Sequence, residues 1–256
     1  MKANTTLVIN PKGGSGKTTI TINLASYFAA NNVPTAVMDY DPQGSSMNWL
    51  RLRTPLGTRI HGANAAPQKG GRIRSVEMYV PENTQQLVIY APAGASGLLL
   101  QEMLCRPDCI IIPVAPSAID IHATANFVKD LLLVGRIRTR NIRLAVVANR
   151  VRASSPVYQP LERFLKSLGL PFLTRVSDSD VYVRAAETGI GIFEMDASAA
   201  AERLEFMPIV EWVSRHRGSE ISTDGKVIEV PHTSWTEKDR TFSFSRSGPK
   251  SLGGPR

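Results

Sequence analysis

Short apolar runs alternate with longer segments of helical periodicity along most of this chain. The runs that predict strands are rich in Val, Ile and Leu, and they cover residues 5–10, 35–38, 86–90, 109–114 and 143–148. The segments that predict helices cover residues 18–30, 46–52, 96–105, 118–135, 156–168 and 199–215. Nearly continuous apolar runs such as 110–112 indicate strands that are buried on both faces. The pattern therefore predicts an α/β fold, with a doubly wound, mostly parallel sheet flanked by helices.

Two stretches lack this pattern. Residues 54–75 are rich in Gly, Pro, Ala and Arg and show little periodicity, which predicts a long surface loop or insertion. From about Gly218 the composition shifts to Ser, Thr, Gly, Pro and charge, although residues 226–230 and 241–245 could form brief strands or a binding motif. We therefore expect one domain over residues 1–217 and a disordered tail over 218–256.

Composition and charge narrow the class of protein. Hydrophobic residues make up 43% and charged residues 20%, with neither a signal region nor a run of the about 18 apolar residues that a membrane span needs, so we expect a cytoplasmic protein. The net charge of +8 lies mainly before residue 217, because the last 40 residues hold seven basic and five acidic residues. Two stretches contain no acid: Arg51, Arg53, Arg59, Lys69, Arg72 and Arg74 in one, and Arg136, Arg138, Arg140, Arg143, Arg150 and Arg152 in the other. This charge favours a polyanionic partner.

The most informative segment is residues 10–19, NPKGGSGKTT, between a predicted strand and a predicted helix. It follows the phosphate-loop pattern G-x-x-x-x-G-K-[ST], except that Pro11 takes the place of the first glycine. Glycines at 13, 14 and 16 leave the backbone N–H groups free to face a phosphate at the positive end of the helix. We expect Lys17 to contact the β- and γ-phosphates and the Thr18 hydroxyl to coordinate Mg²⁺.

Residues 12–19 resemble the deviant Walker A motif of the ParA/MinD family of P-loop ATPases, in which the first lysine is a signature residue. Other segments are similar to the family in the same order: DYDPQG at 39–44 to its switch I, APAG at 91–94 to its switch II, IPVAPS at 112–117 to a later strand and loop, and ANR at 148–150 to its base-contacting strand end. The resemblance covers residues 5 to about 215. It implies a doubly wound sheet that binds ATP and Mg²⁺ and closes into a nucleotide-sandwich homodimer.

The resemblance also implies roles for individual residues. Nucleotide contacts fall on Lys12, Gly13, Gly14, Ser15, Gly16, Lys17, Thr18, Thr19, Asn149 and Arg150. Lys12 and Asp41 carry the catalytic roles: Lys12 reaches the phosphates of a partner subunit across a two-fold axis, and Asp41 orients the attacking water. Mg²⁺ falls on Thr18 and Asp41, and the switch positions around them are Asp39, Pro42, Gln43, Tyr90, Pro92 and Gly94. The Asn149 amide could read the adenine edge or could belong to a turn.

Tyr90 departs from the family pattern. The strand before switch II usually ends in an aspartate that holds the water shell of Mg²⁺, and here that place is filled by tyrosine. A phenol is neutral near pH 7 and is a poor ligand for a hard cation. We therefore predict that ATP binding survives, with slow or partner-dependent hydrolysis.

The resemblance and the charge together indicate an ATP-driven positioning protein. ATP would close a dimer that binds DNA of the nucleoid nonspecifically, and a partner protein on the cargo would stimulate hydrolysis; the cargo could be a plasmid, a chromosome locus or a protein organelle such as a carboxysome. The DNA-binding candidates are Arg136, Arg138, Arg140, Arg143, Arg152, Arg203, Arg215 and Arg217. The family often carries arginines in the loop before its penultimate helix, and this chain has carboxylates there, within residues 176–181.

Two other classes stay open. A MinD-like membrane ATPase needs a C-terminal amphipathic helix, which the prolines at 231, 249 and 255 disfavour. A metabolic enzyme of the ligase or synthetase kind could use the same loop, although no substrate pocket is evident. Cys105 and Cys109 could bridge a cluster between subunits, but we expect two packed thiols.

Overall fold

The computed structural model describes residues 2–53, 59–67, 74–133, 141–152 and 158–215. All of them belong to a unit formed by residues 1–223. The predicted tail from residue 218 lies outside the described residues, as do Arg136, Arg138, Arg140 and Arg217.

The described residues form one sheet of seven parallel strands. The strands are β1 (Asn4–Val8), β2 (Thr35–Asp39), β3 (Ile60–Asn64), β4 (Gln86–Tyr90), β5 (Cys109–Val114), β6 (Arg143–Val151) and β7 (Phe172–Ser177). Their order across the sheet is β3-β2-β4-β1-β5-β6-β7, and every neighbouring pair runs parallel. The predicted parallel sheet is confirmed.

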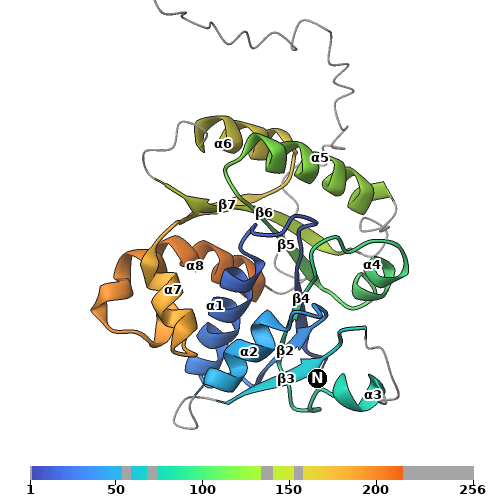
Figure 1. Ribbon diagram of the computed structural model, residues 1–256, viewed down its shortest axis with the longest axis vertical. Helices are drawn as coiled ribbons and strands as arrows, with labels where there is room; N and C mark the ends of the chain where they lie inside the picture. Colours follow the sequence, from blue (N-terminus) through green and yellow to red (C-terminus); the bar gives the residue numbers. More distant parts are fainter. Residues whose placement is uncertain (1, 54–58, 68–73, 134–140, 153–157, 216–256) are drawn as a thin grey trace, which may run out of the picture. The chain divides into compact units, whose positions relative to one another are not determined.

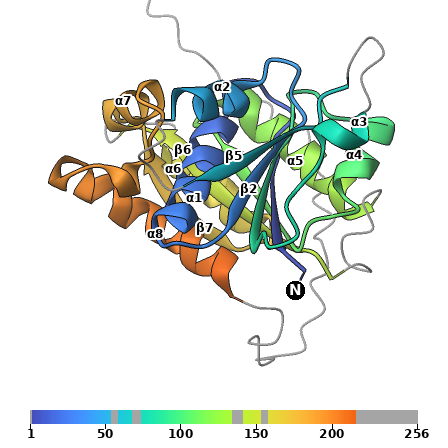
Figure 2. The same cartoon turned by 90° about the horizontal axis from the view of Figure 1, so that it is seen from below.

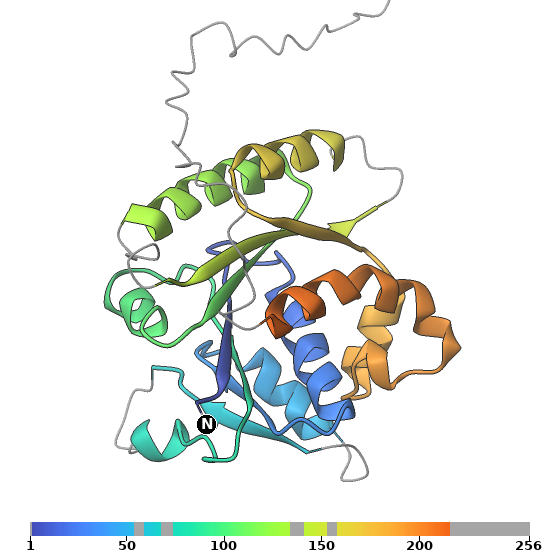
Figure 3. The same ribbon diagram turned by 180° about the vertical axis from the view of Figure 1, so that it is seen from behind.

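Helices cover both faces of this sheet. They are α1 (Lys17–Ala30), α2 (Ser45–Leu52), α3 (Arg74–Glu77), α4 (Gly97–Met103), α5 (Ala118–Leu133), α6 (Tyr158–Ser167), α7 (Asp180–Glu187) and α8 (Ala200–Ser214), with short 3-10 turns at η1 (Ile192–Glu194) and η2 (Ala197–Ala199). α1, α2, α7 and α8 lie on one face, and α4, α5 and α6 lie on the other (Figures 1 and 2). α8 runs beside β7 on the first face (Figure 3). The fold is therefore doubly wound, as predicted.

Each central strand contributes to two hydrophobic cores. In β1 and the residue that follows it, Leu7 and Ile9 point into the core under α4, α5 and α6, whereas Val8 points into the core under α1 and α8. β5 repeats this alternation with Ile110 on one side and Ile111 on the other, and all of these side chains are fully buried. Burial of one such aliphatic side chain contributes about 1.5–3 kcal/mol. This double burial explains why the strands read as continuous apolar runs.

The prediction of a loop over residues 54–75 is wrong for its middle, because Ile60–Asn64 forms edge strand β3, which pairs with β2 along its whole length. The glycine that suggested a loop has a packing role. A Cβ added at Gly62 would lie 2.8 Å from Leu50 Cδ1 and 3.0 Å from Met47 Cε, so the absence of a side chain allows α2 to approach β3. Residues 54–58 and 68–73 lie outside the described residues.

The sequence pattern also does not predict β7, which has one face partly exposed. Of its six residues only Val176 is fully buried, so the apolar run that marks β5 and β6 is missing. Its partner is β6, and the register between them shifts twice. The prediction of two packed thiols is correct for Cys109, which is buried beside Thr6, and wrong for Cys105, which is exposed.

The C-terminal end of α2 is fixed to the segment between α7 and α8. The Trp49 indole donates a hydrogen bond to the Ile190 carbonyl at 3.2 Å, and Arg53 forms an ion pair with Glu194 in which both side chains are largely buried. At Gly189, which has φ +72°, an added Cβ would lie 2.5 Å from the backbone at Leu52 and Arg53. The two segments are thus in direct backbone contact.

The strand order predicts a ligand-binding crevice at the carboxyl ends of the central strands. The chain passes from β1 to β2 in one direction and from β4 to β5, across β1, in the other. Such a reversal opens a space beyond the carboxyl ends of the central strands, where doubly wound proteins bind their ligands. The loops that follow β1, β2, β4 and β6 all begin on this side of the sheet.

Candidate nucleotide-binding site

The loop between β1 and α1 has the backbone shape of a phosphate cradle. Gly14 and Gly16 have φ of 77° and 83°, a region that side chains disfavour. Gly16 precedes the first turn of α1, and no side chain caps that turn, so its N–H groups remain available to an anion. An added Cβ at Gly13 or Gly14 would meet nothing within 4 Å, which leaves room for a ligand beside the loop.

The two lysines of this loop differ in their surroundings. Lys17 is only 5% exposed, and its ammonium donates to the carbonyls of Asn10 and Lys12, both at 3.0 Å. Burial lowers the pKa of Lys17, and the nearby charge of Asp41 opposes that shift. Lys12 is partly exposed, and its ammonium has no hydrogen bond or ion pair with any residue that the structure describes.

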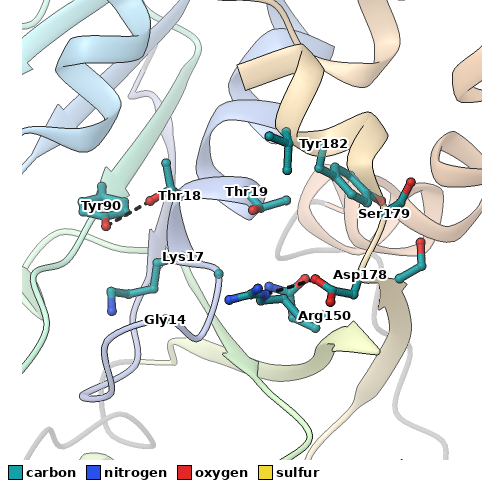
Figure 4. Close-up of a pocket in the computed structure, with 13 residues that line it drawn as sticks. Gly14, Lys17, Thr18, Thr19, Tyr90, Arg150, Asp178, Ser179 and Tyr182 are labelled. Atoms are coloured by element: carbon teal, nitrogen blue, oxygen red, sulfur yellow. Dashed lines mark hydrogen bonds and ion pairs between the residues drawn. The ribbon is translucent and has the colours of Figure 1, made fainter. Parts of the chain in front are cut away.

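Thr18 and Tyr90 are in contact at the wall of the cavity. The Thr18 Oγ1 and Tyr90 Oη atoms lie 3.2 Å apart and share a hydrogen bond (Figure 4). Tyr90 ends β4 and is 5% exposed. Burial raises the pKa of Tyr90, so its phenol is neutral at physiological pH.

Asp39 and Asp41 follow β2 but have different environments. Asp39 is fully buried and accepts hydrogen bonds from the Ser46 hydroxyl at 2.6 Å and from the backbone N–H groups of Ser46, Met47 and Asp41. It therefore caps the first turn of α2, and burial raises its pKa against those hydrogen bonds. Asp41 is partly buried, and its Oδ1 accepts one hydrogen bond, from the Gln43 N–H.

The remaining predicted switch positions are Gly94, Pro92, Pro42 and Gln43. The Gly94 N–H, in a residue with φ 70°, donates to the Pro11 carbonyl at 2.9 Å and so ties the segment after β4 to the phosphate loop. Pro92 is buried, whereas Pro42 and Gln43 are exposed.

Asn149, at the end of β6, supports the phosphate loop from below. Its Nδ2 donates to the Ser15 carbonyl at 2.9 Å and occupies the place where a Cβ of Gly16 would lie, 1.7 Å away. Its Oδ1 is buried and has no partner among the described residues. Reading of adenine by Asn149 therefore stays a prediction, and the structure assigns its amide donor to the loop.

The opposite wall of the cavity comes from β6, β7 and α7. Arg150 has φ 57° and forms an ion pair with Asp178 (Figure 4). Arg152 pairs with the other oxygen of the same carboxylate. With the phosphate loop, these elements line a cavity of about 270 Å³. The sequence pattern does not predict the lining residues Ser177, Asp178, Ser179, Tyr182 and Val183. Ser179 accepts a hydrogen bond from the Val181 N–H, and a serine before an apolar helical segment is the signal that could have located this wall.

Most of the DNA-binding candidates among the described residues form hydrogen bonds or ion pairs within the protein. Arg143 donates to the Trp212 carbonyl at 2.7 Å and stacks over the Trp212 ring, so it closes the end of α8. Arg203 donates to the carbonyls of Ile192 and Met195, and Arg152 is paired with Asp178. Arg215, at the end of α8, is exposed.

The side chains present fit a nucleotide phosphate better than they fit a metal. The loop offers free N–H groups and a buried ammonium to an anion. For a cation, the Thr18 hydroxyl and the Asp41 carboxylate are the available oxygens, since Asp39 accepts four hydrogen bonds, and no three acids, histidines or cysteines cluster within the described ranges. No helix in the described part of the chain is long and apolar enough to cross a membrane.

The sheet order and the loop define a P-loop nucleotide-binding protein. Residues 6–192 match the family described as the CobQ/CobB/MinD/ParA nucleotide binding domain, and the chain therefore belongs to this family of ParA/MinD-like ATPases.

Individual relatives agree with this assignment. The chain is 27% identical over 212 residues to the maintenance of carboxysome distribution protein A of Halothiobacillus neapolitanus, covering 78% of this chain and 93% of that protein. Two solved structures share the fold: the septum site-determining protein MinD of Pyrococcus horikoshii with Mg-ADP (TM-score 0.61, 14% identity, 83% of this chain and 96% of that one), and an aspartate-to-alanine variant of Cyanothece McdA in complex with ATP (TM-score 0.61, 13% identity, 82% and 95%).

Proposed function

We propose that this protein is an ATP-driven positioning ATPase. ATP closes a homodimer, the dimer binds DNA of the nucleoid without sequence preference, and a partner protein on the cargo stimulates an otherwise slow hydrolysis. A relative with 27% identity is named for carboxysome distribution, which supports a protein organelle as the cargo.

The contrast between the two loop lysines carries the proposal. Lys17 is buried, and its ammonium donates hydrogen bonds to two backbone carbonyls of its own loop. Lys12 is partly exposed and has no acidic partner among the described residues. A second copy placed across a two-fold axis would offer its nucleotide phosphates to the free ammonium of Lys12. Dimerisation would then depend on the bound nucleotide.

ATP and Mg²⁺ would bind through groups already in place. The N–H groups at the start of α1 and the Lys17 ammonium would hold the phosphates, and Thr18 and Asp41 would be the protein ligands nearest a cation. When bound, the cation neutralises phosphate charge. Asp41 keeps one oxygen clear of the Gln43 N–H and is suited to orient a water molecule.

The charge of the chain supports a polyanionic partner. Of the net +8, most lies before residue 217. Because Arg143, Arg152 and Arg203 have contacts within the fold, we assign DNA binding first to the exposed Arg215 and to the arginines at 136, 138, 140 and 217. Counterion release from DNA phosphates makes such binding strongly dependent on salt.

Binding to a labelled random-sequence DNA duplex tests the proposal. Affinity is measured with ATP, ADP or no nucleotide at about 50 and 200 mM salt, a range over which several phosphate contacts change affinity by orders of magnitude. We expect ATP to strengthen binding at both salt concentrations. Lys12→Ala should abolish the ATP effect, whereas Lys129→Ala, which removes an exposed lysine of α5, should retain it.

The outcome that contradicts the proposal is equal DNA affinity in all three nucleotide states. Molecular mass in solution, measured with and without ATP, gives a second readout of Lys12. If Lys12→Ala still dimerises with ATP, the role of Lys12 across the two-fold axis is wrong even where DNA binding depends on nucleotide.

A further inference from the structure

A pair of hydroxyl groups from two different elements lies beside the phosphate loop. Tyr90 ends β4, and Thr18 lies in the first turn of α1. The Tyr90 Oη and Thr18 Oγ1 atoms lie 3.2 Å apart and share a hydrogen bond. Figure 4 shows the Thr18 and Tyr90 hydroxyls pointing toward one another at the wall of the cavity. The hydroxyl that would ligate a cation is therefore already in contact with a neutral group.

Asp39 and Asp41, the two acids after β2, differ in how many of their oxygen atoms are already hydrogen-bonded. Asp39 is fully buried and accepts four hydrogen bonds, so binding a cation would cost it its contacts to α2. Asp41 has one oxygen bound to the Gln43 N–H. The Lys17 ammonium, which lies among the carbonyls of the phosphate loop, supplies positive charge to a phosphate without any metal.

We infer that Tyr90 is a positioning residue that makes nucleotide binding largely independent of a divalent cation. The inference rests on the proposed nucleotide site. A carboxylate at the end of β4 would repel the phosphates unless a cation stood between them. A phenol adds no negative charge. Because one hydroxyl of the Thr18–Tyr90 pair donates to the other, the second O–H of the pair is left to donate to a phosphate oxygen.

Calorimetric titration of the full chain with ATP and with ADP, in excess MgCl₂ and in EDTA, tests this role. For the wild type we expect the two buffers to give dissociation constants within about threefold of each other, because the contacts to phosphate come from the protein. Tyr90→Asp should weaken binding in EDTA by about tenfold or more and should regain affinity in MgCl₂.

Two further variants separate this role from packing. Tyr90→Phe keeps the buried ring but loses the O–H, so it should weaken binding in both buffers and leave their ratio near one. Tyr79→Phe removes an exposed phenol and should change neither value. Thermal unfolding of each variant shows whether it is folded.

A wild type that loses more than about tenfold in affinity on chelation overturns the inference. That result would leave ATP-dependent DNA binding, and so the proposed function, untouched. Failure to bind nucleotide in either buffer would overturn both, and the wild-type comparison decides the question even if Tyr90→Asp does not fold.

Discussion

The two walls of the nucleotide cavity are held by different kinds of contact. On the phosphate side, Lys17 and Asn149 are buried and donate to backbone carbonyls of the phosphate loop. The buried Asp39 accepts hydrogen bonds from N–H groups around the start of α2. On the opposite side, Asp178 bridges Arg150 and Arg152, whose side chains are 55% and 75% exposed. Hydrogen bonds in a buried site are strong and insensitive to salt, whereas exposed ion pairs are screened.

This difference separates a preformed half of the site from an adjustable one. The phosphate side has its backbone fixed before any ligand arrives, which reduces the entropy lost on binding. The opposite side depends on contacts that salt and pH can weaken. The comparison predicts that equivalent substitutions will have unequal effects on the two walls.

The largest effect is expected at Asp39. Asp39→Ala leaves the donors of Ser46, Met47 and Asp41 without their acceptor, and we expect it to lower the free energy of unfolding by about 3 kcal/mol or more. Asp41→Ala removes a carboxylate that accepts one backbone hydrogen bond and should cost about 1 kcal/mol or less. Urea unfolding measures both values, and similar losses in the two variants would contradict the assigned roles.

A smaller effect is expected in the phosphate loop. Gly16→Ala forces a side chain into a left-handed backbone position and against Asn149 Nδ2, so we expect a loss of about 2 kcal/mol in stability. Gly13→Ala is the control: its φ is not positive and its Cβ would meet nothing within 4 Å, so its stability should change by about 0.5 kcal/mol at most. Equal melting temperatures for the two variants would show that the loop is not preformed.

The smallest effect is expected at Asp178. The Arg152 and Arg150 guanidinium groups lower the pKa of Asp178, so the charged form stabilises the folded state at pH values above the ordinary aspartate pKa of about 3.9. This contribution is lost as pH falls through the lowered pKa. Asp178→Asn should cost at most about 1 kcal/mol at pH 7, and the difference from wild type should shrink in high salt and in acid.

Denaturant unfolding at two salt concentrations and several pH values measures this difference. Asp130→Asn, which removes an exposed acid of α5, is the control and should show no such dependence. If Asp178→Asn lowered the free energy of unfolding by several kcal/mol at every salt concentration, the two walls would not differ in the way described.

The sequence predicts the centre of the fold better than its edges. β1, β4 and β5 are buried on both faces, and their apolar runs record that burial. β3 contains Gly62, and β7 has exposed residues because it lies at the border of the sheet, so neither has the pattern of a central strand. Edge strands depend on a partner that local sequence does not reveal.

The candidate site shows the same limit. The glycines and lysines of the phosphate loop follow a fixed local spacing, so the sequence locates them. The local sequence around Asp178 indicates only an acid in a loop. Its pairing with Arg150 and Arg152 depends on β6 and β7 lying side by side. The donation from Asn149 to the Ser15 carbonyl joins residues more than a hundred positions apart, and no local pattern encodes it.

The anchoring of α2 at both ends constrains how the predicted switch I segment, residues 39–44, can change shape. Asp39 fixes the first turn of the helix, and the contacts of Trp49 and Arg53 with residues 189–194 fix its last turn. Sliding of the whole helix would break buried contacts at both ends. We therefore expect any rearrangement around Asp41 to be absorbed by rotation of the few backbone dihedrals over residues 41–44, where Gly44 already has a positive φ. In such a rearrangement those residues would act as the hinge, and α2 would stay in place.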